Sequence, residues 1–107
     1  MTKVLVSGAN GRTGRAIVQA LARAGSPRVP VVVRALLRNA AQWPTVAALG
    51  ASEHAIGDMA DADGVARALE GCDALVHVGP PMHPDEKTMT ANFIAAAGRQ
   101  KLRHFVY

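Results

Sequence analysis

The sequence is poor in cysteine and in aromatic residues: among its 107 residues there is one cysteine, Cys72, and aromatic side chains make up 4%. A single cysteine cannot form an intrachain disulfide, which is typical of proteins from a reducing, cytoplasmic compartment. The sequence has no apolar run near the roughly 20 residues of a membrane-spanning helix, and no basic-then-apolar signal region at its start. We therefore expect a cytoplasmic protein without a membrane segment. The length predicts one domain over residues 1–107.

Acidic residues are also scarce, and twelve Lys and Arg against eight Asp and Glu give a formal net charge of +4. An excess of positive charge is one property of nucleic-acid-binding proteins. The arginines are scattered, however, and no aromatic residues alternate with them, so direct nucleic-acid binding is not expected. The four histidines show no metal-ligand spacing with Cys72 or with one another, and we predict no metal site. They are His54, His77, His83 and His104.

The most informative stretch that is present is segment 8–14, Gly-Ala-Asn-Gly-Arg-Thr-Gly. It follows the apolar run Val4–Val6 and precedes a helical pattern, which is the context of a dinucleotide-binding fingerprint. Gly8 permits a sharp turn, Gly11 lets a pyrophosphate approach the main chain, and Gly14 lets the helix pack on the strand. The first helical amides would then face the phosphates. The alternative is an ordinary glycine-rich turn; a P-loop is excluded because no Gly-Lys-Ser/Thr follows.

Apolar periodicity predicts strands that alternate with helices along the whole chain. The expected strands are Lys3–Ser7, Val31–Leu37, Ser52–Ile56, Ala74–Val78 and His104–Tyr107. The expected helices are Arg12–Ala24, a short one within Asn39–Gly50 with Pro44 in its first turn, one through Val65 and Leu69 capped by Asp61 or Asp63, and Glu86–Arg99 capped by Asp85. This alternation predicts an α/β, Rossmann-like, doubly wound parallel sheet with strand order 3-2-1-4-5. Ligands bind such a sheet where the order reverses, at the carboxyl ends of strands one and four.

Five segments, 4–14, 34–39, 57–58, 76–81 and 103–107, together resemble the N-terminal part of the short-chain dehydrogenase/reductase superfamily, specifically its atypical NmrA-like NAD(P)-binding branch. The resemblance covers the whole chain but only about two fifths of a family domain of roughly 250 residues. We therefore expect the sheet to be truncated after strand five, before the serine and the Tyr-x-x-x-Lys motif of catalytic members. Tyr107 resembles the last residue of the strand, and Glu86 stands where extended members often carry asparagine. No catalytic residue is assigned.

The resemblance implies a set of cofactor-binding residues spread over four loops. They are Gly8, Asn10, Gly11, Arg12, Thr13, Gly14, Arg38, Asp58, Met59 and Gly79. NAD-selective relatives carry an acidic residue near the end of strand two, but no acidic residue occurs from Lys3 to Ser52. Arg38 at that place, with Arg12 as a second candidate, favours the 2′-phosphate of NADP over NAD. Surface arginine is the alternative for both, and a loop or helix-capping role is the alternative for Asp58, whose implied partner is the adenine amino group.

The function that follows is the NADP(H)-binding part of an NAD(P)-dependent reductase, with a dinucleotide cofactor and a small-molecule substrate. The alternative is a non-enzymatic redox- or cofactor-sensing module that acts through a protein partner. Strand five would be an edge with unpaired backbone groups, and its Phe105 and Val106 would lose part of their cover. We therefore also expect a homo-oligomer.

Overall fold

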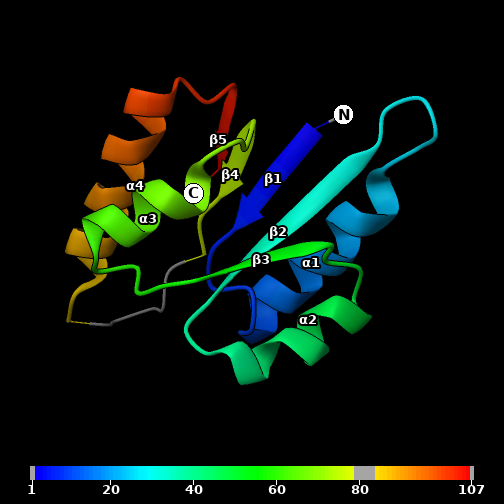
Figure 1. Ribbon diagram of the computed structural model, residues 1–107, viewed down its shortest axis with the longest axis horizontal. Helices are drawn as coiled ribbons and strands as arrows, with labels where there is room; N and C mark the ends of the chain where they lie inside the picture. Colours follow the sequence, from blue (N-terminus) through cyan, green and yellow to red (C-terminus); the bar gives the residue numbers. More distant parts are fainter. Residues whose placement is uncertain (1, 79–83, 107) are drawn as a thin grey trace.

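The computed structural model describes residues 2–78 and 84–106, and these form a parallel five-stranded sheet in the order β3-β2-β1-β4-β5 (Figure 1). The strands are β1 (Thr2–Val6), β2 (Val31–Leu37), β3 (Glu53–Ile56), β4 (Ala74–Val76) and β5 (His104–Val106). All four neighbouring pairs are parallel. The predicted α/β fold class and strand order are thereby confirmed.

Two helical layers cover the sheet, with α1 and α2 on one face and α3 and α4 on the other (Figure 1). The helices are α1 (Arg12–Ala24), α2 (Trp43–Ala48), α3 (Ala62–Leu69) and α4 (Glu86–Gln100), and a 3₁₀ turn, η1 (Ala40–Gln42), leads into α2. Pro44 lies in the first turn of α2 as predicted, and Asp61 caps α3 by accepting a hydrogen bond from the Asp63 amide at 3.1 Å. Asp85 occupies the N-cap position of α4.

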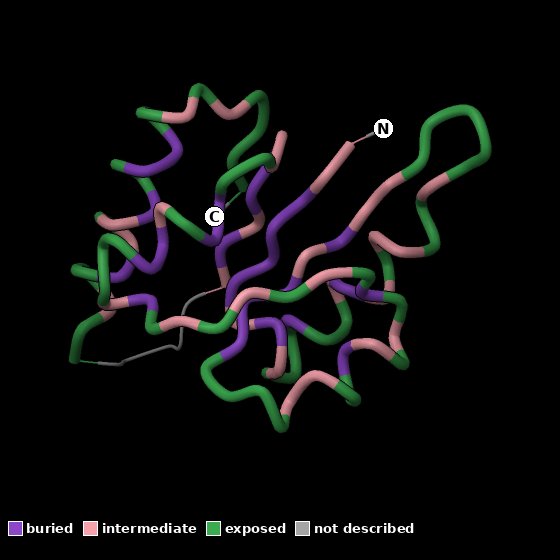
Figure 2. The backbone as a smooth tube through the Cα atoms, in the orientation of Figure 1, coloured by how far each residue is buried: buried purple, intermediate pink, exposed green. Residues whose placement is uncertain are grey.

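The core is divided by the sheet, because successive strand residues face opposite layers. Val4 and Val6 of β1 pack toward α1, where they meet Val18, whereas Leu5 faces α3 and α4, where it meets Phe93. All five are at most 4% exposed. The central strands are accordingly buried in Figure 2, while β5 is exposed along its length. Burial on both faces explains the nearly continuous apolar runs of the central strands.

The ladder between β1 and β4 ends earlier than the sequence predicts. Strand boundaries were expected at Ser7 and Val78, but pairing stops at Val6 and Val76. Gly8, with φ +60°, turns the chain away, and the Ser7 hydroxyl replaces a main-chain partner by accepting a hydrogen bond from the Val78 amide at 2.9 Å. A side chain therefore ends this ladder. Elsewhere the bounds differ by one residue: β1 begins at Thr2, β3 at Glu53, α4 ends at Gln100, and Tyr107 lies outside the described residues.

Arg34, which interrupts the apolar run of β2, ties β2 to β3 and α3. Its Nε donates to Glu53 at 3.0 Å, and its Nη1 donates to the carbonyl oxygens of Ala68 and Glu70, each at 2.6 Å. Lys3 forms a second ion pair with Glu53 at 2.9 Å. Hydrogen bonds from Lys3 and then Arg34 lower the pKa of Glu53. These charges therefore hold elements together, away from the glycine turn.

Candidate functional site

The turn between β1 and α1 depends on two glycines for its shape. Gly8 adopts φ +60°, a region that L side chains rarely enter, and a Cβ there would clash with the Val78 carbonyl oxygen. A Cβ on Gly14 would clash with the carbonyl oxygen of Gly8. The first glycine thus allows β1 to turn against the end of β4, and the other allows α1 to pack closely on that turn, as the sequence predicts.

Gly11 is different, because the fold does not require a glycine there. Its backbone is ordinary (φ −76°, ψ 169°), and a Cβ would meet only the Gly8 carbonyl oxygen, at 3.4 Å. Gly11 is exposed and is the N-cap of α1. The missing side chain therefore leaves open the approach to the first-turn amides of α1, where the positive end of the helix dipole lies.

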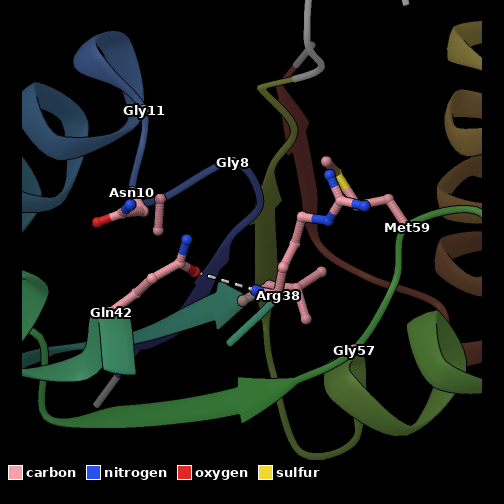
Figure 3. Close-up of a pocket in the computed structure, with 9 residues that line it drawn as sticks. Gly8, Asn10, Gly11, Arg38, Gln42, Gly57 and Met59 are labelled. Atoms are coloured by element: carbon pink, nitrogen blue, oxygen red, sulfur yellow. Dashed lines mark hydrogen bonds between the residues drawn. The ribbon is translucent and has the colours of Figure 1, made fainter. Parts of the chain in front are cut away.

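A cavity of about 220 Å³ opens beside this turn, at the carboxyl ends of β1, β2 and β3 (Figure 3). Its walls are formed by three loops and the end of β2: Gly8, Ala9, Asn10, Gly11, Leu36, Arg38, Gln42, Gly57 and Met59. Five of the ten predicted cofactor residues are among them, namely Gly8, Asn10, Gly11, Arg38 and Met59. In Figure 3, the Arg38 side chain extends from the end of β2 in the direction of Met59.

The other predicted residues lie around this cavity or outside the described part of the chain. Arg12 and Thr13 are exposed in the first turn of α1, and Gly14 is buried beneath it. Asp58 is exposed, and its carboxylate accepts a hydrogen bond from the Ala60 amide at 2.9 Å. That bond is of the loop-capping kind, so adenine recognition by Asp58 stays a prediction. Gly79 lies outside the described residues, as do Pro80, Pro81, Met82 and His83.

Sequence reasoning did not identify Gln42, which lines the cavity and hydrogen-bonds to Arg38. The Arg38 amide donates to Gln42 Oε1 at 3.2 Å. Gln42 lies on the 3₁₀ turn η1, which has no apolar period to reveal it. Sequence reasoning identified Met59 but not Asn92, the residue of α4 that holds the Met59 main chain. Asn92 Nδ2 donates to the Met59 carbonyl oxygen at 3.0 Å.

A buried polar network lies directly under the glycine turn. The Ser7 hydroxyl hydrogen-bonds with His77 Nδ1 at 2.7 Å, and His77 Nε2 with the Thr90 hydroxyl at 3.2 Å. The His77 ring also packs on Phe93, with ring centroids 4.4 Å apart. Burial lowers the pKa of His77, opposed by the charge of Glu86, so the ring is neutral at pH 7. Since Ser7 is fully buried, its hydroxyl holds the ends of β1 and β4 together and is no exposed nucleophile.

A metal site and a membrane-spanning helix are both absent from the part of the chain that the structure describes. Over residues 2–78 and 84–106, no three His, Cys, Asp or Glu side chains gather closely enough to hold a metal ion. No helix within those ranges is both long and apolar enough to cross a bilayer.

Burial raises the pKa of the Cys72 thiol, which is therefore protonated at neutral pH.

Known proteins share this arrangement. A family model described as NAD(P)H-binding matches residues 8–107. The NAD(P)H azoreductase of Xenophilus azovorans is 35% identical over 103 residues, which are 96% of this chain and 34% of the azoreductase. A putative NAD-dependent epimerase/dehydratase from Bacillus halodurans is 26% identical with a TM-score of 0.81, over 98% of this chain and 50% of that one. Citrobacter sp. triphenylmethane reductase complexed with NADP(H) is 25% identical with a TM-score of 0.75, over 96% of this chain and 35% of the reductase chain.

The chain thus spans between a third and a half of the length of these relatives. They do not support the alternative of a regulatory module. The residues present fit a dinucleotide: two glycines shape the turn, a third leaves the helix amides accessible, and a cavity adjoins them. Family match and geometry agree, and the chain belongs to the NAD(P)H-binding family as a Rossmann-like domain.

Proposed function

We propose that this chain is the NADP(H)-binding part of an NmrA-like, NADP(H)-dependent reductase. One observation carries the proposal: the cavity has the glycine turn on one wall and Arg38 on another, and none of the described residues that line it bears a carboxylate. A guanidinium with no competing carboxylate suits a phosphate dianion better than a ribose hydroxyl.

Two acidic residues near β3, Glu53 and Asp58, do not alter this balance. Asp58 lies between Gly57 and Met59 but does not line the cavity, and its carboxylate accepts a hydrogen bond from the Ala60 amide. Glu53 is paired with Arg34 and Lys3, and it lies at the start of β3, whereas the cavity lies beyond the end of that strand. Arg38 itself is exposed, so its guanidinium is available to a ligand. The proposed division of roles is that Gly11 and the α1 amides bind the pyrophosphate and Arg38 binds the 2′-phosphate.

The reductase assignment follows from the relatives, one an azoreductase and another a triphenylmethane reductase. Both names specify reduction of an organic molecule, and we propose a substrate of this class for the whole protein. When bound, the reduced nicotinamide supplies a hydride. The residues of this chain bind and orient the cofactor. The proton-donating residues of the whole protein are proposed to lie in the further part that the relatives contain.

Replacement of Arg38 by alanine tests this assignment. We expect Arg38→Ala to raise the Kd for NADPH by about 10- to 100-fold, the ~1.5–3 kcal/mol of a charge-assisted hydrogen bond, and to change the Kd for NADH much less. Isothermal titration calorimetry with both cofactors measures this. Arg28→Ala is the control, since it removes an equal charge from the exposed loop before β2. Equal losses for both cofactors in Arg38→Ala would refute the assignment.

A further inference from the structure

Gln42 is held in a fixed position at the edge of the cavity. Its amide donates to the Asn39 carbonyl oxygen at 3.0 Å, and the Asn39 side chain caps the same turn by accepting from the Ala41 amide at 2.8 Å. The next residue, Trp43, begins α2 and packs against the core on the α1 side. The main-chain position of Gln42 is therefore fixed by the hydrogen bonds of the turn before it and by the packing of Trp43 after it.

The orientation of the Gln42 carboxamide is also determined. Because the Arg38 amide can only donate, the group that accepts from it at 3.2 Å must be the carbonyl oxygen, Oε1. The Nε2 amino group then occupies the other branch, and it points toward the glycine turn and Asn10 (Figure 3). Gln42 thus presents its Nε2 amino group at the same cavity that Arg38 lines.

This arrangement has a consequence for ligand choice. A phosphate monoester only accepts hydrogen bonds near neutral pH, so it gains from a neutral donor in the same cavity as a guanidinium. A carboxylate in the same place would repel a phosphate but accept from a ribose 2′-hydroxyl, as in NAD-selective sites. We propose that Gln42 is a specificity-determining residue, whose Nε2 donates to the 2′-phosphate of NADP(H). The inference rests on the proposed function.

The sharpest test is Gln42→Glu, which keeps the size of the side chain and an oxygen that can accept from the Arg38 amide. Only the amino group is replaced, by a negative oxygen. Calorimetry with NADPH and NADH should show the Kd for NADPH raised at least tenfold and that for NADH unchanged or lowered. Gln19→Glu is the matched control, since it makes the same charge change in the middle of α1, outside the cavity. It should leave the ratio of the two Kd values within about twofold of wild type.

An unchanged ratio in Gln42→Glu, or an equal change in Gln19→Glu, overturns the inference. If circular dichroism shows that Gln42→Glu does not fold, Gln42→Leu is the deciding variant, because it removes the N–H donors without adding charge. It should raise the Kd for NADPH several-fold and the Kd for NADH much less. Equal changes in the two Kd values overturn the inference. A different result contradicts the proposed function. The proposed function and the inference are both wrong if the wild type binds neither cofactor, or if Arg38→Ala raises the Kd for NADPH and for NADH equally. If Arg38→Ala alters selectivity and Gln42→Glu does not, only the inference is wrong.

Discussion

At the residue scale, the three glycines of the turn have different physical reasons to be glycine. Gly8 needs a positive φ and room for the Val78 carbonyl group, and Gly14 needs room for the main chain of the turn. Gly11 needs neither, and its proposed reason to be glycine is the approach of the cofactor pyrophosphate. Stability measurements should therefore separate Gly14, where a side chain would clash, from Gly11, where it would not.

Two helical glycines allow a direct test of the packing role. Gly14→Ala should lower the free energy of unfolding by on the order of 1–3 kcal/mol, because the new methyl group would overlap the Gly8 carbonyl group. Gly98→Ala, in α4, should raise it by roughly 0.5–1 kcal/mol, because nothing lies within 4 Å of its Cβ position and alanine favours the helix. Urea unfolding measures both. A Gly14→Ala protein as stable as the wild type would rule out the packing role.

Arg38 and Met59 were expected near the cofactor from the resemblance to a family, whereas other residues were identified because the local backbone sets their role. Gly8 and Gly14 follow from the strand-turn-helix pattern, and Asp61 from its place before a helix. Gln42 could not be identified in this way, since its role arises from a hydrogen bond across the η1 turn and from the meeting of three loops. The Ser7–His77 bond was equally hidden, because the two residues are 70 positions apart.

At the element scale, the bounds of α1 and β2 were predictable and the end of β4 was not. Helix α1 matches its predicted bounds, since its apolar period is strong and Gly25 ends it. Strand β4 is shorter than predicted, because the Ser7 side chain takes the hydrogen bond that a main-chain carbonyl would otherwise accept. The apolar pattern of residues 74–78 does not reveal that a side-chain hydroxyl replaces a main-chain acceptor here.

Strand β5 is the exposed edge of the described sheet, and self-association there remains a prediction. Phe105 is 36% exposed and Val106 is 56% exposed, and among the described residues the strand pairs with β4 alone. Exposed edges with apolar side chains favour pairing with another chain. We expect sedimentation velocity to show a concentration-dependent dimer of this chain, and Phe105→Lys to dissociate it without unfolding the protomer. A wild type that stays monomeric across a wide concentration range and melts cooperatively would contradict this.

At the scale of the whole molecule, the parallel order β3-β2-β1-β4-β5 brings together segments that are far apart in the sequence. The glycine turn, Arg38 and Met59 follow β1, β2 and β3, whose carboxyl ends all lie at one edge of the sheet. The sequence predicted a site at the carboxyl ends of strands one and four, whereas the described cavity lies at the ends of β1, β2 and β3, and residues 79–83 of the loop after β4 lie outside the described residues. That the strand ends meet at one edge of the sheet was predictable from the alternation of strands and helices. The cavity's width and the direction of its side chains were not, because they depend on packing between loops.

The account depends most on the open position at Gly11, and a calorimetric titration of NADPH into the wild type and Gly11→Val tests it most directly. We expect saturable binding to the wild type and none detectable to Gly11→Val, because the valine side chain would occupy the approach to the α1 amides. The circular dichroism spectrum should be unchanged, with a loss of stability of at most about 1 kcal/mol at this helix N-cap, since the backbone suits valine and the nearest contact of its Cβ is 3.4 Å. Undiminished NADPH affinity in Gly11→Val, or no NADPH binding by the wild type, would contradict the account.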